Sequence, residues 1–267
     1  MMENLRVVAK KARRHVLEMA YGAKDSHIGC ALSSVDVLVA LYFRVMNVNP
    51  AEPDALGRDR FVLSKGHAAS ALYAVLCGRG FFSERELTAF AKDGSKIASH
   101  VGRGVLPGVE TNGGSGGHGL SLGNGMALVA RKDSAGSRIF VLMGDGELQE
   151  GSVWEAAMFA SSRNLSNITL IVDRNMFQTW RRVDDVVAVE PIAGKFLAFG
   201  WNVDEVDGHN IEKLTAVLNK AGSRPHAVVA RTVKGKGVSF MEGSGDWHNG
   251  VLTEEQYQKA LEEVDRA

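Results

Sequence analysis

The stretch from Ile139 to Gln178 decides the fold. It begins IFVLMGDGELQEGSVWEAAMFA and, after seven further residues, continues ITLIVDRNMFQ. Residues 139–143 and 168–172 are short unbroken apolar runs, which are typical of parallel strands covered on both faces. The segment between them has the length of an ordinary helix. The pattern therefore predicts a strand, a helix and a strand, and with them an α/β fold whose mainly parallel sheet has helices on both faces.

Two polar residues follow these strands. Asp145 comes after the first apolar run and Asn175 after the second. Because the carboxyl ends of parallel strands meet at one edge of a sheet, both side chains are expected there, where open α/β sheets bind ligands. Gly144 and Gly146 allow close approach of a ligand, and the following helix start favours an anion. A magnesium ion holding a phosphate fits these features. The alternative is a solvated turn with an Asn cap.

The spacing of these residues resembles that of a known cofactor-binding motif. Gly-Asp-Gly is followed after 28 residues by Asn, which resembles the diphosphate-binding motif of thiamine-diphosphate enzymes. The fuller wording, GDGELQEGSVWEAAMFA and then IVDRN, resembles the transketolase family, in particular the amino-terminal subunit of split transketolases. This resemblance implies the thiamin diphosphate-binding fold, with thiamine diphosphate and Mg²⁺ (or Ca²⁺ or Mn²⁺) as cofactors. It implies metal ligation by Asp145, Asn175 and the main-chain carbonyl of Phe177, and cofactor binding by Gly144, Asp145, Gly146, Glu147 and Asn175.

The composition argues against several classes of protein. At 267 residues, with Lys plus Arg and Asp plus Glu at 31 each, nothing indicates a nucleic-acid or membrane surface. The amino terminus lacks an apolar signal-peptide core, and no apolar run is expected to reach membrane-spanning length. Cys30 and Cys77 fall in apolar segments, which indicates buried thiols rather than a disulfide or a metal site. A cytoplasmic protein with a single domain, residues 1–267, is expected.

His27 lies in the loop formed by residues 25–30. An apolar helix is expected over residues 34–46, with Ser33 or Ser34 as its cap. A histidine in such a loop is by default a surface residue. The resemblance implies instead that His27 contacts the substrate and is catalytic.

Two further histidines follow in the next part of the chain. His67 stands after a short strand at 60–63, in the wording Ser-Lys-Gly-His-Ala-Ala, and a helix is expected over 68–77. Alone it would be an ordinary histidine at a helix start, whereas the resemblance implies that it faces thiamine diphosphate. His100 keeps the family's spacing to Gly-Val-Glu at 108–110, although the flanking Gly and Pro are missing. The resemblance assigns it a catalytic part.

A glycine-rich run at residues 111–119 precedes a helix expected over 120–130. It could be a flexible loop only, but here it resembles the transketolase loop beside the cofactor, so Gly114 and Gly116 are predicted to bind the cofactor. The chain departs from the family at Gly116, where Leu is usual, and at His118, where Gln is usual. The loop is therefore expected to order when the cofactor or a partner arrives.

Other positions have both an ordinary and a family interpretation. His248 follows Trp and matches a family motif, which implies both catalytic and cofactor-binding roles, whereas His209 is expected to be structural. Residues 234–237 read Lys-Gly-Lys-Gly, which could be a phosphate loop but lacks the context of a P-loop. Glu150 and Glu155 favour the helix dipole, and the resemblance places both at a dimer interface.

The remaining pattern completes an alternation of strands and helices. An amphipathic helix is expected over 3–22, a capping box at Ser83, strands near 200–207 and 227–232, a helix over 211–220, and a charged helix from Thr253 onward.

The resemblance covers essentially this whole chain but only half of a full transketolase. It implies that the pyrimidine-binding domain, which carries the Glu that activates thiamine, is on a separate carboxyl-terminal subunit. A homodimer of this chain would pair with two such subunits, giving a heterotetramer. The implied reaction of carbohydrate metabolism transfers a two-carbon ketol unit from a ketose phosphate to an aldose phosphate.

Other functions remain open at this level. The chain could be a subunit of another thiamine diphosphate enzyme, of a transketolase-like enzyme specialised for an unusual sugar, or a cofactor-binding relative without turnover. The segment Met176 to Arg182 departs from the family most clearly, because it holds Trp180, Arg181 and Arg182. These side chains could recognise a phosphate or carboxylate. Otherwise they form a surface loop or a subunit contact.

Overall fold

The computed structural model describes residues 4–133 and 136–266. Within them, five parallel strands form one sheet in the order β1-β2-β3-β7-β6. Their bounds are β1 Arg60–Leu63, β2 Ile139–Gly144, β3 Ile168–Arg174, β6 Asn202–Asp207 and β7 His226–Arg231. The predicted strand, helix and strand are confirmed, because β2 and β3 are neighbours and α6 (Gly151–Ser162) connects them. All strands present their carboxyl ends at one edge of the sheet.

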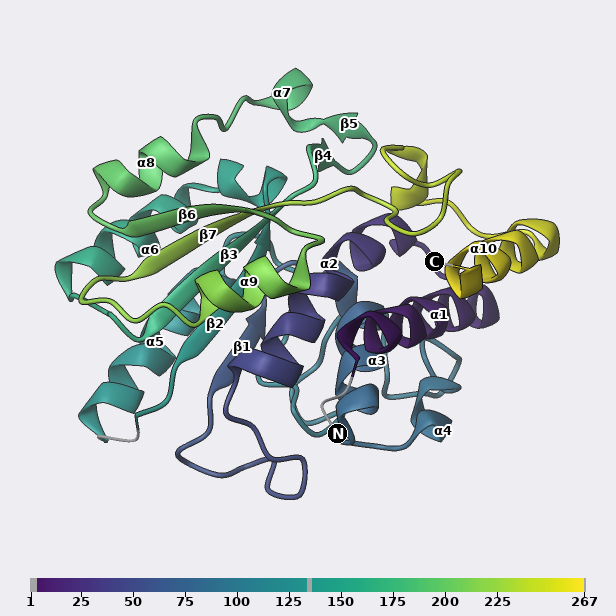
Figure 1. Cartoon of the computed structure of the whole chain (residues 1–267), viewed down its shortest axis with the longest axis horizontal. Helices are drawn as coiled ribbons and strands as arrows, with labels where there is room; N and C mark the ends of the chain where they lie inside the picture. The colour runs from purple at the N-terminus through teal and green to yellow at the C-terminus, as the bar shows by residue number, and fades with distance from the viewer. Residues whose placement is uncertain (1–3, 134–135, 267) are drawn as a thin grey trace.

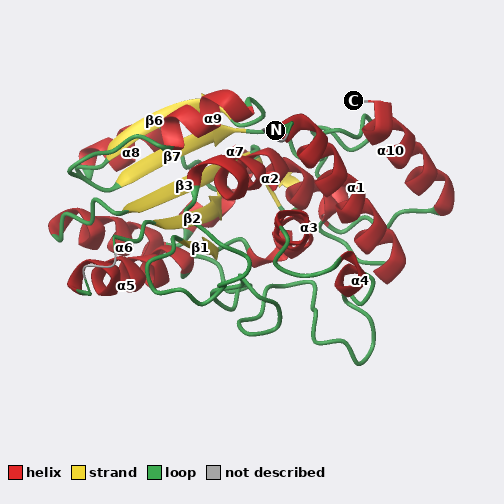
Figure 2. Ribbon diagram, turned by 60° about the horizontal axis from the view of Figure 1, so that its bottom comes forward, coloured by secondary structure: helices red, strands yellow, loops and turns green. Residues whose placement is uncertain are grey.

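Helices cover both faces of the sheet, as predicted (Figure 2). Along β2, Phe140 and Leu142 enter one hydrophobic core, and Val141 and Met143 enter the other. This alternation explains why the run is apolar throughout. The first core is built with α2 (Ile28–Ala40) and α9 (Ile211–Leu218), and the second with α5 (Gly119–Lys132), α6 and α8 (Ile192–Ala198).

A group of helices lies beside one end of the sheet (Figure 1). It contains α1 (Leu5–Ala23), α3 (Ala69–Arg79) and α10 (Glu254–Arg266), with the single-turn α4 (Glu84–Leu87) nearby. The first and last helices of the chain pack on each other, and the rings of Tyr21 and Tyr257 stack with centroids 4.2 Å apart. The helices expected over 3–22 and from Thr253 are confirmed within the described residues, and residues 1–3 lie outside them.

The start of α2 differs from the prediction. The helix begins at Ile28 rather than at residue 34, and His27 is its N-cap with φ of 67°. The hydroxyls of Ser33 and Ser34 are inside the helix and donate to the carbonyl of Cys30 at 3.0 and 2.9 Å. The expectation that either serine caps the helix was wrong, because both are one turn inside it and satisfy their hydroxyls there.

The same helix corrects a second expectation. With its π-helical continuation η1 (Leu41–Val45), it forms an apolar stretch of 18 residues with a mean hydropathy of 1.7, which reaches membrane-spanning length. The stretch is 89% buried within the protein. That burial accounts for its composition, since a helix that is hydrophobic all round suits a core. Cytoplasmic localisation stays a prediction.

Two smaller expectations have opposite outcomes. The capping box at Ser83 was wrong, because its side chain makes no capping hydrogen bond within the described residues and α4 lasts only four residues. Cys30 and Cys77 are both buried, and neither forms a disulfide in the described part of the chain. The prediction of two buried thiols is therefore confirmed.

Short elements surround the carboxyl edge of the sheet. These are the 3₁₀ turns η2 (Gly66–Ala68), η3 (Gly146–Gln149) and η4 (Asp246–His248), the antiparallel hairpin of β4 (Phe177–Gln178) and β5 (Arg181–Arg182), and the single-turn α7 (Val183–Val186).

Candidate active site

A cavity of about 340 Å³ lies at the carboxyl edge of the sheet. Every residue that the sequence assigned to catalysis, cofactor or metal lines it. These are His27, His67, His100, Gly114, Gly116, Gly144, Asp145, Gly146, Glu147, Asn175, Phe177 and His248. The structure thus brings together residues from seven separate parts of the chain, while their individual roles remain predictions.

Four imidazoles form one side of the cavity. The ring centroid of His27 is 5.0 Å from that of His248 and 5.5 Å from those of His67 and His100. The backbone N–H of His27 donates to the carbonyl of His248 at 2.8 Å, which ties the start of α2 to η4. Four imidazole side chains therefore meet around one point.

Three of these imidazoles are held neutral. Burial lowers the pKa of His248 to about 4, helped by the neighbouring Lys234 and His27. Burial and the nearby Lys65 lower the pKa of His67 well below its ordinary value. The pKa of His27 is also lowered, mainly by burial. Each ring can accept as well as donate a hydrogen bond, which suits contacts with hydroxyl groups.

Asp145 and Asn175 meet as their positions predicted. The Asp145 carboxylate accepts from the backbone N–H of Gly146 at 2.9 Å and from that of Met176 at 2.6 Å. The Asn175 side-chain oxygen accepts from the N–H of Phe177 at 3.0 Å. Burial, together with the nearby carboxylate of Asp173, raises the pKa of Asp145 to about 7. A carboxyl group in this state gains most from a cation beside it.

Sequence reasoning missed a buried ion pair behind these residues. Lys65 and Asp173 are almost fully buried and form a salt bridge. Asp173 also accepts from Ser33 at 2.7 Å and from the hydroxyl of Thr232, and the amide of Asn175 donates to it at 3.3 Å. The pair thus fixes the orientation of the Asn175 amide. A charged residue within a strand covered on both faces was the signal that could have revealed it.

Lys234 is a second cation that the sequence did not assign to the site. It is 1% exposed, donates to the carbonyl of Thr179, and its Nζ lies 5.5 Å from the centre of the Phe177 ring. Burial lowers its pKa to about 8. The Lys-Gly-Lys-Gly sequence by itself suggests only a generic phosphate loop. In the structure its first lysine, Lys234, lines the cavity.

Glu147 has a different part from its neighbours. Its carboxylate accepts from the Ser64 hydroxyl, from the N–H of Gly117 at 2.8 Å and from the N–H of Gly144 at 3.2 Å. It therefore clamps the glycine-rich loop to the ends of β1 and β2. This geometry favours a positioning role, and direct contact of Glu147 with a cofactor stays a prediction.

The glycine-rich loop approaches the site closely. A Cβ on Gly66 would lie 2.4 Å from the backbone nitrogen of Gly114, and Gly114 itself has φ of 124°. The two backbones can pass this closely only because Gly66 has no side chain. Gly114, Gly116 and His118 are exposed, so this part of the loop is open to solvent where Gly114 and Gly116 line the cavity.

The structure also shows where three residues without a predicted catalytic role lie. His209 is structural, as predicted, because its ring lies 2.7 Å from the Asp36 carboxylate and accepts from the N–H of Val233 at 2.8 Å. Glu150 and Glu155 are exposed at the start of α6, and Glu150 also borders the cavity. Their predicted place at a dimer interface stays a prediction.

Comparison with known proteins decides the family. Residues 5–264 match the family described as transketolase, thiamine diphosphate binding domain. The chain belongs to the transketolase family. The predicted fold is confirmed as well, because the structure of transketolase from Leishmania mexicana superposes with a TM-score of 0.92 at 28% identity. That match covers 99% of this chain and 42% of the other, so the chain spans about two fifths of that transketolase.

Two relatives match along nearly their whole length. An apulose-4-phosphate transketolase subunit from Phocaeicola vulgatus is 43% identical over 98% of this chain and 94% of its own. The 6-deoxy-6-sulfo-D-fructose transketolase subunit SqwG from Clostridium sp. is 38% identical over 97% of this chain and 95% of its own. The chain is thus similar in extent to transketolases that are named as subunits.

Proposed function

We propose that this transketolase-family chain is the amino-terminal subunit of a split transketolase. It would transfer a two-carbon ketol unit from a ketose phosphate to an aldose phosphate, using thiamine diphosphate and Mg²⁺. One observation carries the proposal: the chain spans 94% of a relative named as a transketolase subunit but only 42% of the transketolase from Leishmania mexicana. The cavity that collects all the predicted site residues supports it.

The rest of the active site would come from a second chain. The family resemblance places the Glu that activates thiamine on a pyrimidine-binding domain. We infer that residues 1–267 form one diphosphate-binding domain and that a carboxyl-terminal subunit supplies the other. Two copies of each chain would form the assembly.

The cavity fits a divalent cation and a diphosphate in three respects. The buried Asp145 carboxyl has a raised pKa, and a cation would stabilise its charged form. The side-chain oxygen of Gln178 borders the cavity, buried and without a hydrogen-bond partner among the described residues. Lys65 and Lys234 add positive charge beside it. When bound, thiamine diphosphate supplies a nucleophilic carbon and an electron sink, and the protein supplies position and proton transfer.

The histidines would divide the remaining work. His67 would face the cofactor, while His27, His100 and His248 would hold the substrate hydroxyls and move protons between them. The ring centroids of His248 and His100 lie 5.0 and 5.5 Å from that of His27, which supports this division because a small sugar can contact several rings at once.

The sugar is proposed to be an unusual one. The two relatives are named for apulose 4-phosphate and for 6-deoxy-6-sulfo-D-fructose, so one name contains a phosphate group and the other a sulfo group. We infer that this chain provides the shared ketol chemistry. The phosphate-end contacts of the sugar would lie mainly on the partner.

Reconstitution tests the proposal. The purified chain is mixed with its carboxyl-terminal partner, and ketol transfer is measured with a panel of ketose and aldose phosphates. We expect activity from the mixture with Mg²⁺ and thiamine diphosphate, and none from either chain alone. Turnover at enzymatic rates by this chain alone would refute the split assembly. Cofactor binding without turnover in the mixture would favour the non-catalytic relative.

The metal assignment has its own test. Asp145→Ala should abolish Mg²⁺-dependent thiamine diphosphate binding in the reconstituted enzyme, because it removes the only charged ligand in the proposed set of Asp145, Asn175 and Phe177. Isothermal titration calorimetry measures this. Asp207→Ala is a matched control, since Asp207 is an exposed carboxylate at the end of β6. Unchanged cofactor affinity in Asp145→Ala would contradict the assignment.

A further inference from the structure

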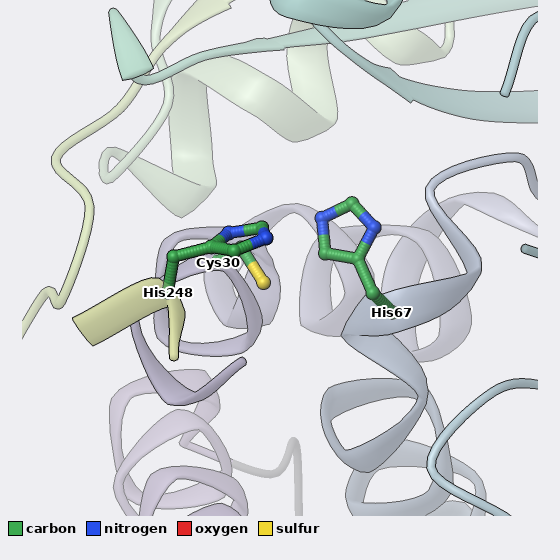
Figure 3. A group of neighbouring side chains, drawn as sticks. All are labelled: Cys30, His67 and His248. Carbon is green, nitrogen blue, oxygen red and sulfur yellow. The ribbon is translucent and has the colours of Figure 1, made fainter. Parts of the chain in front are cut away.

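Cys30, His67 and His248 form a cluster that the proposed chemistry does not explain. Their ligand atoms, one sulfur and two ring nitrogens, all lie within 4.8 Å of one another. Figure 3 shows the three side chains converging from α2, η2 and η4. A zinc ion with bonds of about 2.0–2.3 Å would need these atoms roughly 1 Å closer. Side-chain rotation can supply a shift of that size.

The backbone around the cluster is already fixed. Cys30 is in the first turn of α2, and that turn is tied to η4 by the 2.8 Å hydrogen bond from His27 to the carbonyl of His248. Lys65, next to η2, donates to the carbonyl of Cys30 at 3.2 Å. The three ligand-bearing segments are therefore held together before any ion arrives, which lowers the cost of binding.

The donor set selects a class of ion. Thiolate and imidazole favour thiophilic cations such as Zn²⁺, whereas Mg²⁺ prefers the oxygen atoms offered by Asp145 and Asn175. We propose that Cys30, His67 and His248 form a binding site for a thiophilic divalent cation, separate from the proposed magnesium site in the same cavity. Nothing in the transfer of a ketol unit requires this site.

Binding replaces the proton of Cys30 with the metal ion, and the proton leaves to solvent. The thiol now donates to the carbonyl of His27 at 2.9 Å, a bond that the thiolate gives up. Burial raises the pKa of Cys30 to about 11, which opposes this exchange. The start of α2 and the nearby lysines favour the thiolate. His67 and His248 are neutral and need lose no proton.

The site would regulate the enzyme by exclusion. His67 and His248 are also predicted to contact thiamine diphosphate, so an ion held by both rings would prevent their contact with the cofactor. This consequence rests on the proposed function, whereas ion binding itself does not. Zn²⁺ would then weaken cofactor binding in proportion to its occupancy.

Metal binding is tested on the chain alone, without cofactor or partner. Zn²⁺ affinity is measured by calorimetry, and Co²⁺ is added separately to detect thiolate-to-metal charge-transfer absorption. We expect one high-affinity site with that absorption in the wild type. Cys30→Ala should lose the absorption and weaken Zn²⁺ binding by at least about a hundredfold, since loss of even an outer-shell partner costs 10–100-fold.

Cys77→Ala is the matched control, because Cys77 is the other buried thiol and lies in α3. It should bind Zn²⁺ as the wild type does. Wild-type affinity in Cys30→Ala, or absence of the charge-transfer absorption in the wild type, would overturn the site. Circular dichroism confirms that each variant is folded. These outcomes leave the ketol-transfer proposal unaffected, because no partner or cofactor is present.

The exclusion is tested in the reconstituted enzyme. The apparent Kd for thiamine diphosphate should rise with Zn²⁺ in the wild type and in Cys77→Ala, but not in Cys30→Ala over the same range. An unchanged Kd in the wild type at saturating Zn²⁺ would overturn the regulatory consequence.

Discussion

The ion pair of Lys65 and Asp173 shows how single residues hold the site. Asp173 is fully buried and Lys65 nearly so. Because water does not hydrate these charges, the salt bridge between them compensates each one. Asp173→Ala should destabilise the chain by about 3–5 kcal/mol, because it leaves a buried unpaired charge. Denaturant unfolding measures this. Glu262→Ala, which breaks an exposed pair with Arg266, should cost less than about 1 kcal/mol. Similar losses in both variants would contradict the argument.

The buried histidines make stability depend on pH. Burial lowers the pKa of His67 and lowers that of His248 from 6.5 to about 4, so the folded state keeps both rings neutral. Below pH 6.5 these two imidazoles bind protons in the unfolded chain, whereas in the folded chain they stay neutral. The contribution of these two histidines to stability is therefore fully present above pH 6.5 and is lost as the pH drops toward 4, whereas the raised pKa of Asp145 acts in the opposite direction below pH 7.

This pH dependence can be measured on the cofactor-free chain. Between pH 7.5 and pH 5 the unfolding midpoint of His248→Gln should rise relative to that of the wild type, because the variant lacks one of these two rings and keeps the opposing effect of Asp145. His118→Gln changes an exposed ring and should keep the wild-type slope. Equal slopes in all three proteins would show that His248 does not contribute.

At the scale of elements, the hairpin of β4 and β5 has two separate sides. Phe177, Gln178 and Thr179 line the cavity, whereas within the described residues Trp180 and both following arginines lie outside its lining and are exposed. The backbone of the hairpin packs closely against Gly245. A Cβ on Gly245 would lie only 2.1 Å from the carbonyl oxygen of Trp180. This placement favours a subunit contact over recognition of the sugar.

The hairpin prediction follows from that placement. Replacing Arg181 and Arg182 together by Ala should weaken assembly with the carboxyl-terminal partner and leave cofactor affinity unchanged, because two exposed charges are removed from the proposed contact. Sedimentation of the mixed subunits measures assembly. Replacing Lys213 and Lys220, two exposed cations on or next to α9, is the control. A raised Michaelis constant with normal assembly would favour sugar recognition instead.

At the scale of the whole molecule, an apolar surface lies on α5 and α6, which pack side by side. Its exposed members are Leu122, Leu128, Val129, Met158 and Phe159. Leu128 and Phe159 line one depression together with Glu155, and exposed apolar side chains that lie together mark sites of association. The predicted homodimer would use this surface.

The dimer prediction is tested by charge. Leu128→Glu with Phe159→Glu should convert the dimer to monomers, because it places charges where apolar side chains would be buried. Light scattering after size exclusion measures the mass. Leu197→Glu, which makes the same kind of change on the exposed side of α8, should remain dimeric. A monomeric wild type would refute the dimer outright.

The local sequence pattern predicts the central unit, and the sequence also predicts the residues that gather in the cavity. Apolar runs at 139–143 and 168–172 suit strands covered on both faces, and parallel strands must bring Asp145 and Asn175 to one edge. The sequence motifs of the family then located the four histidines and the glycine-rich loop. These features depend on local pattern and on spacing, and both can be read directly from the linear sequence.

The neighbours of these residues depend on contacts between distant parts of the chain. The pairing of Lys65 with Asp173 joins positions 108 residues apart, and the cluster of Cys30, His67 and His248 spans most of the chain. Local pattern also misplaced the start of α2, because Ser33 and Ser34 look like caps until their hydroxyls are seen to bond to Cys30 and Asp173. Burial, which sets the charge states in the cavity, results from long-range packing that no local pattern encodes.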